Sequence, residues 1–113
     1  MKNIKLYESF ENYYEKIDAH EFINHYLGDE NFNEKEILVI DNILPKWNKD
    51  SRNQYPWCRT YHSGKFYIVI TKHVDEWYLV RCYIDQNNIE EYYKCDQFEG
   101  LIKCLTDKLI YKV

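Results

Sequence analysis

The stretch KFYIVITKHVDEWYLVRCYI, residues 65–84, decides the fold. Its two flanks, residues 65–71 and 76–84, are rich in β-branched and aromatic residues, and their pattern has a period of two. Both features are typical of β-strands. The segment KHVD between them, residues 72–75, fits a tight turn. Because so short a connection joins neighbouring antiparallel strands, the stretch predicts a β-hairpin.

The chain continues this pattern toward its C-terminus. The segment DQNN at residues 85–88 predicts a second turn, and IEEYYK at residues 89–94 predicts a third strand. A three- to four-stranded antiparallel meander is therefore expected over about residues 65–94. Such a sheet needs a further layer to bury its apolar face.

A closing helix is predicted over about residues 96–109. Asp96 and Glu99 have the spacing of a capping box, which satisfies free amide groups at a helix N-terminus. The apolar residues at helical spacing, which would pack on the sheet, are Phe98, Leu101, Ile102, Leu105 and Leu109. Gly100 costs about 1 kcal/mol relative to alanine inside a helix. Its presence predicts a close approach to a bulky aromatic residue or to the sheet.

The N-terminal region is predicted to be helical. An approximate helical stripe of apolar residues runs from Ile4 to Ile17. Asp18 and Asn33 are each followed three residues later by glutamate, so two more capping boxes are expected to begin helices there. The chain as a whole predicts an α+β fold with N-terminal helices, an antiparallel meander and a C-terminal helix.

Length and composition indicate one domain spanning residues 1–113. No run of residues is apolar enough for a membrane span or a signal peptide, so we expect a cytoplasmic protein with reduced cysteines. The net charge of −4 disfavours nucleic-acid binding by the whole surface. Lysine outnumbers arginine 12 to 3, a bias typical of AT-rich genomes such as those of low-GC bacteria and their phages.

No cofactor, metal or catalytic site is predicted. The four cysteines, Cys58, Cys82, Cys95 and Cys104, lack the close pairs of a structural zinc site. His20 and His25 are five residues apart, so one helix would not turn both toward one metal ion. There is no glycine-rich phosphate loop and no nucleophile elbow. A pocket that gathers His62 or His73 with a distant acid stays possible.

Residues 46–61, KWNKDSRNQYPWCRTY, show no clear period and predict a long connection, with a short helical turn or an edge strand as options. Aromatic and basic residues alternate here, and the candidate partner-binding residues are Trp47, Arg52, Tyr55, Trp57 and Arg59. Tryptophan, tyrosine and arginine are enriched at protein hot spots. The same residues suit base stacking on single-stranded nucleic acid or nucleotide. The third possibility is a loop that its tryptophans pin to the core.

An acidic surface is expected in the first third of the chain. Residues 1–36 carry nine acidic residues and four lysines, and Glu11 and Glu15 represent this face. A partner with a basic groove would complement it. These features favour a small, tyrosine-rich, non-catalytic protein that binds another protein as an inhibitor or adaptor. Single-stranded nucleic-acid binding through residues 46–61 is the alternative. The sequence does not indicate an oligomeric state.

Overall fold

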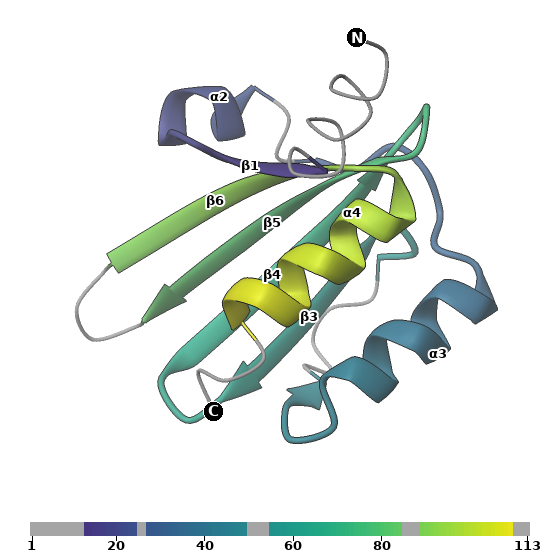
Figure 1. Ribbon diagram of the computed structural model, residues 1–113, viewed down its shortest axis with the longest axis vertical. Coiled ribbons are helices and arrows are strands. Elements are labelled where there is room, and N and C mark those ends of the chain that lie inside the picture. The colour runs from purple at the N-terminus through teal and green to yellow at the C-terminus, as the bar shows by residue number, and fades with distance from the viewer. Residues whose placement is uncertain (1–12, 25–26, 50–54, 85–88, 110–113) are drawn as a thin grey trace, which may run out of the picture.

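The computed structural model describes residues 13–24, 27–49, 55–84 and 89–109. A six-stranded antiparallel sheet with the order β1-β6-β5-β4-β3-β2 forms its centre (Figure 1). The strands are β1 (Tyr14–Ile17), β2 (Asn48–Lys49), β3 (Cys58–Ser63), β4 (Phe66–His73), β5 (Trp77–Ile84) and β6 (Ile89–Asp96). The helices are α2 (Ala19–Ile23), α3 (Glu34–Ile43) and α4 (Gln97–Cys104), and a π-helical turn, η1 (Leu105–Leu109), continues α4. The fold is α+β, as predicted.

The predicted meander corresponds to β4, β5 and β6. The β4–β5 pairing runs from Phe66 opposite Ile84 to His73 opposite Trp77. The connection between them is a tight turn, as predicted, but it covers residues 74–76 in place of 72–75, because Lys72 and His73 extend β4. Asp75 has a φ of +67° in this turn. Strand β6 then pairs with β5 along its whole length. Successive side chains of these strands point to opposite faces of the sheet, which gives the period of two seen in the sequence. This period is why the sequence predicted the three strands.

The predicted sheet of three to four strands is too small, because the chain adds strands at both edges. Strand β3 pairs with β4 from Cys58 to Ser63, and the two-residue strand β2 pairs with β3. Both strands lie in the region that was assigned mainly to a connection, with an edge strand only as an option. In β3 the two buried apolar residues, Cys58 and Tyr61, are three positions apart, so the strand lacks the period-two pattern that marks the other strands.

The prediction of a helix from Ile4 to Ile17 is wrong at its C-terminal end. Residues 14–17 form β1, which pairs antiparallel with β6, and residues 1–12 lie outside the described part of the chain. The physical reason is tertiary. The edge of β6 offers backbone partners, and Tyr14 packs edge-on against Tyr93, with ring centroids 6.1 Å apart. Such cross-strand contacts outweigh a weak local helical pattern.

The predicted helix starts are correct for α2 and α3. The Asp18 side chain accepts a hydrogen bond from the Glu21 amide, at 2.9 Å. The Asn33 box is complete, because its side chain accepts from the Glu36 amide at 2.8 Å and the Glu36 carboxylate accepts from the Asn33 amide at 2.9 Å. The box predicted at Asp96 does not form, since that side chain makes no capping hydrogen bond.

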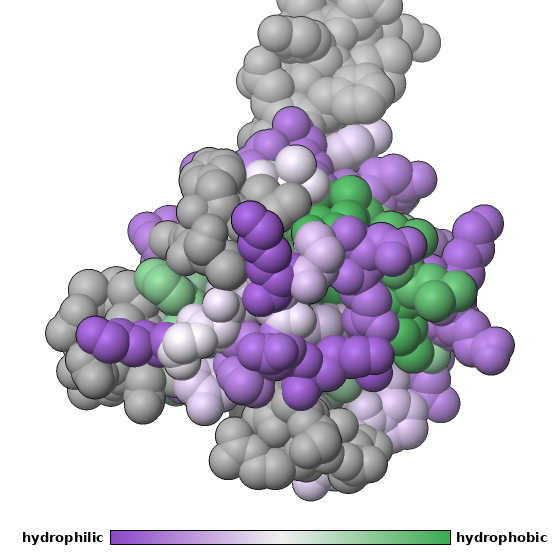
Figure 2. All heavy atoms as spheres, turned by 90° about the horizontal axis from the view of Figure 1, so that it is seen from below, coloured by the Kyte–Doolittle hydropathy of each residue, from purple (hydrophilic) through white to green (hydrophobic). Residues whose placement is uncertain are grey.

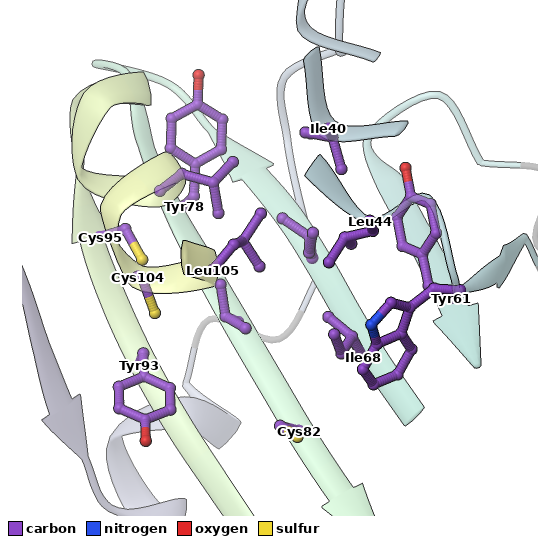
Figure 3. Close-up of a cluster of buried hydrophobic side chains, with 14 of the residues drawn as sticks. Ile40, Leu44, Tyr61, Ile68, Tyr78, Cys82, Tyr93, Cys95, Cys104 and Leu105 are labelled. Carbon is purple, nitrogen blue, oxygen red and sulfur yellow. The ribbon is translucent and has the colours of Figure 1, made fainter. Parts of the chain in front are cut away.

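One face of the sheet carries the main core under α3 and α4 (Figure 1). Leu101, Cys104 and Leu105 are fully buried against the sheet, as predicted for the two leucines. Phe98 and Ile102, which were assigned to the same face, are half-buried, and the Leu109 side chain lies outside the described part of the chain. Figure 3 shows Tyr78, Tyr93 and Cys95 on the α4 side of this core, and Leu44, Tyr61 and Ile68 on the α3 side. The other face buries a smaller cluster of Ile17, Phe22, Leu79 and Tyr92.

The predicted close approach at Gly100 is present. A Cβ atom there would lie 2.4 Å from the backbone oxygen of Tyr13, directly before β1. The neighbour is therefore the backbone of an aromatic residue at the sheet edge. Within the described ranges, none of the helices has the length and apolar character needed to cross a membrane.

Candidate functional site

Residues 27–32, which we call the strap, lead into α3 and close one end of the sheet. The backbone amides of Asp29 and Glu30 donate to the Lys72 carbonyl at 3.0 and 3.2 Å, and the Phe32 amide donates to the Pro56 carbonyl at 3.0 Å. The Lys72 amide in turn donates to the Trp57 carbonyl at 3.1 Å. The strap thus forms hydrogen bonds with backbone groups at the end of β4 and in the segment before β3, and these bonds fix its position.

Gly28 makes this close contact possible. A Cβ atom at this position would lie 2.7 Å from the Lys72 carbonyl oxygen and 2.8 Å from the Trp57 carbonyl oxygen. Both atoms belong to backbone that is hydrogen-bonded in place, so neither can move easily. The strap therefore needs a residue without a side chain here.

We expect Gly28→Ala to lower the free energy of unfolding by about 1–3 kcal/mol, the usual cost of forcing extra atoms into a packed site. Urea denaturation followed by circular dichroism measures this loss. Asn31→Ala, at an exposed position of the same strap, is the control and should change stability by less than about 0.5 kcal/mol. Equal stability of both variants would mean that the strap does not pack as described.

An aromatic pair lies beside the strap. The rings of Tyr55 and Trp57 stack with their centroids 4.9 Å apart and an interplanar angle of 23°. Tyr55 is 59% exposed, and Trp57 is half-buried with its backbone against Gly28. The neighbouring Leu27 and Val74 are 57% and 47% exposed. We call these four residues, with the adjacent acidic residues Asp29, Glu30, Asp75 and Glu76, the strap surface.

A buried polar cluster supports this surface from beneath. Asp29 accepts a hydrogen bond from the Val74 amide at 2.9 Å, and its carboxylate lies 3.9 Å from Nδ1 of His73. The His73 ring stacks on Trp77 at 3.9 Å between centroids, and its Nε2 lies 3.0 Å from the Thr71 hydroxyl. These contacts hold the strap and the β4–β5 turn in one arrangement, so the exposed apolar residues stand on a fixed base.

A second buried network joins α3 to the sheet. The Glu36 carboxylate accepts hydrogen bonds from the Lys72 ammonium at 2.8 Å and from the Tyr78 hydroxyl at 2.6 Å. Burial by itself raises the pKa of Glu36, but the hydrogen bonds from Lys72, Tyr78 and the Asn33 amide outweigh it. The pKa therefore lies below its ordinary value of 4.5. The same carboxylate raises the pKa of the buried Tyr78 further above the ordinary range.

The structure separates the residues predicted for partner binding. Tyr55 and Trp57 lie together in the strap surface. Trp47 is buried in the main core, where its indole nitrogen has no hydrogen-bond partner in the described part of the chain. Burial favours the interpretation of Trp47 as a residue that pins its segment to the core. Arg52 and Glu11 lie outside the described residues.

Arg59 is paired with an acid of α3, and Glu15 lies away from the aromatic pair. Arg59 is 3.6 Å from the Asp41 carboxylate, which also binds Lys49 at 3.1 Å and the Tyr61 hydroxyl at 2.7 Å. Two of the basic residues in segment 46–61 are thus occupied by one acid of α3. Glu15 is exposed on β1, at the opposite edge of the sheet.

Leu27, Val74 and the acids around them were missed by the sequence interpretation. They come from two segments far apart in the chain, and only the backbone contacts of the strap bring them to residues 55–57. Gly28 was the available signal, because a glycine between exposed residues can mark a close backbone contact.

Other surfaces offer fewer features that suit a partner. Figure 2 shows the molecule from below, the end at which the β3–β4 turn lies in Figure 1, and hydrophilic side chains cover most of it. Hydrophobic side chains gather toward the right, the side of α3. Leu38 of α3 is 63% exposed, but no aromatic residue of comparable exposure accompanies it on α3 among the described residues.

The gathering of His73 with Asp29 and Thr71 does not open onto a pocket, because His73 and Thr71 are 3% and 2% exposed. A hollow of about 600 Å³ lies elsewhere, beside β1, and its lining consists of Lys16, Ile17, Asp18, Ala19, Glu90 and Tyr92. Within the described ranges, no three or more His, Cys, Asp or Glu side chains are grouped so that they could hold a metal ion. The four cysteines are buried and form no disulfide bond with one another.

Comparison with known proteins does not indicate a function, so the proposal below rests on the geometry of the chain. No protein-family model matches the chain, and no curated protein or solved structure is significantly similar to it.

Proposed function

We propose that the chain is a small non-catalytic binding protein that contacts another protein through the strap surface. The observation that carries this proposal is the exposed Tyr55–Trp57 stack beside Leu27 and Val74. Aromatic side chains on a fixed base lose little conformational freedom on binding and dominate the energy of many interfaces. An inhibitor or an adaptor, which acts by occupying a partner surface, needs no more than such a patch.

The local charge supports a protein partner over a nucleic acid. The acids of the strap surface would repel phosphate groups next to the aromatic pair. In segment 46–61, Lys49 and Arg59 already pair with Asp41, which leaves fewer cations for phosphate contacts. Accordingly, short single-stranded oligonucleotides at low salt should not quench the tryptophan fluorescence of the protein.

The test is a selection from a random peptide library on the folded protein, followed by affinity measurements with the selected peptides. We expect Tyr55→Ala to weaken their binding by about tenfold or more, because a truncated hot-spot tyrosine loses at least about 1.4–2 kcal/mol. The free energy of unfolding should change by less than about 0.5 kcal/mol, since Tyr55 is mostly exposed.

Lys65→Ala, in the exposed β3–β4 turn at the other end of the sheet, is the control variant and should bind like the original protein. Trp57→Ala is less informative because Trp57 is half-buried, so its loss should reduce both stability and affinity. Selected peptides that bind Tyr55→Ala and the original protein equally would contradict the proposal.

A further inference from the structure

Among the described residues of the segments that form the strap surface, the exposed charges are all negative. The strap, residues 55–58 and residues 72–77 together carry the acids Asp29, Glu30, Asp75 and Glu76, all of them exposed. The basic side chains in these segments are Lys72 and His73, and both are buried. Lys72 is also neutralised by Glu36. Among the described residues, the segments that form the strap surface therefore expose acidic side chains and no basic one.

These carboxylates are not engaged by cations of the described chain, apart from the 3.9 Å approach of His73 to Asp29. Glu30, Asp75 and Glu76 form no ion pair with any residue in the described ranges. The Asp29 side chain keeps 59% of its surface exposed while one oxygen holds the Val74 amide. They are available to pair with charges from outside.

The fold elsewhere places a cation over an aromatic ring. The Lys94 ammonium lies 4.9 Å from the centre of the Trp77 ring, and the Arg81 guanidinium lies 5.9 Å from that of Phe22. Arg59 lies 5.8 Å from the Tyr61 ring in the same way. No cation of the described residues takes this position over Tyr55, the exposed member of the stacked pair.

We propose that the strap surface binds a partner-protein segment that carries arginine or lysine, with the cation at the exposed Tyr55 ring and its charge complemented by the acids of the strap surface. This inference rests on the proposed function and adds the chemistry of the partner. An exposed ring attracts a cation through its quadrupole, and acids beside it add charge complementarity. Arginine suits the site better than lysine, because its planar guanidinium both stacks on a ring and pairs with carboxylates.

The probes are three short Gly/Ser peptides of equal length that carry spaced arginines, lysines or glutamines. Each is titrated into the isotope-labelled full-length protein and followed by NMR. We expect the arginine peptide to bind about two- to fivefold more tightly than the glutamine peptide, the size of one exposed cation–ring pair. The arginine peptide should shift the protein signals of the Trp57 indole N–H and of the strap amides. Added salt should weaken its binding.

Matched variants separate the site from general charge attraction. Tyr55→Leu keeps an apolar side chain but removes the ring. This variant should bind the arginine peptide no more tightly than the glutamine peptide. Glu30→Gln with Asp75→Asn should weaken the arginine peptide about fivefold. Glu15→Gln with Glu21→Gln removes the same charge at β1 and α2, and it should have little effect. Equal losses from the two double variants would overturn the inference.

The two proposals fail in distinguishable ways. Library peptides that need Tyr55 but carry no arginine or lysine would leave the proposed function intact and refute the cationic partner. An arginine peptide whose binding depends on Glu15 and Glu21, and not on Tyr55, would place the contact on the N-terminal acidic face. That outcome would refute both proposals.

Discussion

Glu36→Ala is expected to lower the free energy of unfolding by about 3–5 kcal/mol, the usual cost of removing one partner of a buried ion pair. The Lys72 ammonium would stay buried without a counter-charge, and the Tyr78 hydroxyl would lose its acceptor. The Asn33 capping box would also lose one of its two hydrogen bonds. Urea or guanidinium denaturation measures the loss directly.

Two control variants isolate the cause. Glu34→Ala changes an exposed acid in the first turn of the same helix, so it should cost less than about 0.5 kcal/mol. The double variant Glu36→Met, Lys72→Met removes both charges at similar volume, and it should be more stable than Glu36→Ala alone. A Glu36→Ala variant as stable as Glu34→Ala would show that the network is not buried.

The pH dependence follows from the same carboxylate. Because the folded pKa of Glu36 lies below the ordinary value of 4.5, the ionised carboxylate stabilises the fold above about pH 4.5. This contribution is lost as the pH falls through the lowered folded pKa. The stability difference between the original protein and Glu36→Gln should therefore shrink below about pH 4.5 and stay constant from there to neutral pH.

Leu101→Ala is expected to cost about 2–5 kcal/mol, because it leaves a cavity between α4 and the sheet. Leu101 is fully buried and belongs to the main core with Leu105 and Tyr78. Leu38→Ala makes the same chemical change at a side chain that is 63% exposed, so it should cost less than about 0.5 kcal/mol. Similar losses at both positions would mean that the buried face of α4 is misassigned.

The strands and helices that the sequence located carry strong local signals. Strands β4, β5 and β6 follow one another through short connections and alternate apolar side chains, and α3 begins at a capping box that forms completely. Leu101 and Leu105 were assigned to the buried face of the closing helix, and both are fully buried. In each case a pattern within a short stretch of the chain indicated the element or its buried face.

The strands at the sheet edges could not be located in this way. Strand β1 is held by its pairing with β6, about eighty residues away. Strand β3 has apolar residues without a period of two, and it is located by its pairing with β4. Short local patterns contain no information on such distant pairing, so a weak helical stripe and an aperiodic segment were the only signals there.

For the same reason, only part of the candidate site could be predicted from the sequence. Tyr55 and Trp57 stand out in the sequence as aromatic residues in a turn-rich segment. Their neighbours Leu27 and Val74 come to them only because Gly28 allows the strap to lie against the sheet. Trp47, in the same segment as the pair, is buried instead. The two residues after it, Asn48 and Lys49, form strand β2 and pair with β3 at the edge of the sheet.

The most direct test of the strap surface is a map of amide chemical shifts while a library-selected peptide is titrated into the full-length protein. We expect the largest shifts in residues 27–30, 55–57 and 74–76, with β1, α2 and the β3–β4 turn nearly unchanged. Tyr55→Ala should abolish the map at the same peptide concentration without unfolding the protein. Shifts that concentrate on α3 around Leu38, or on the acidic residues of β1 and α2, would contradict the assignment of the strap surface as the contact site.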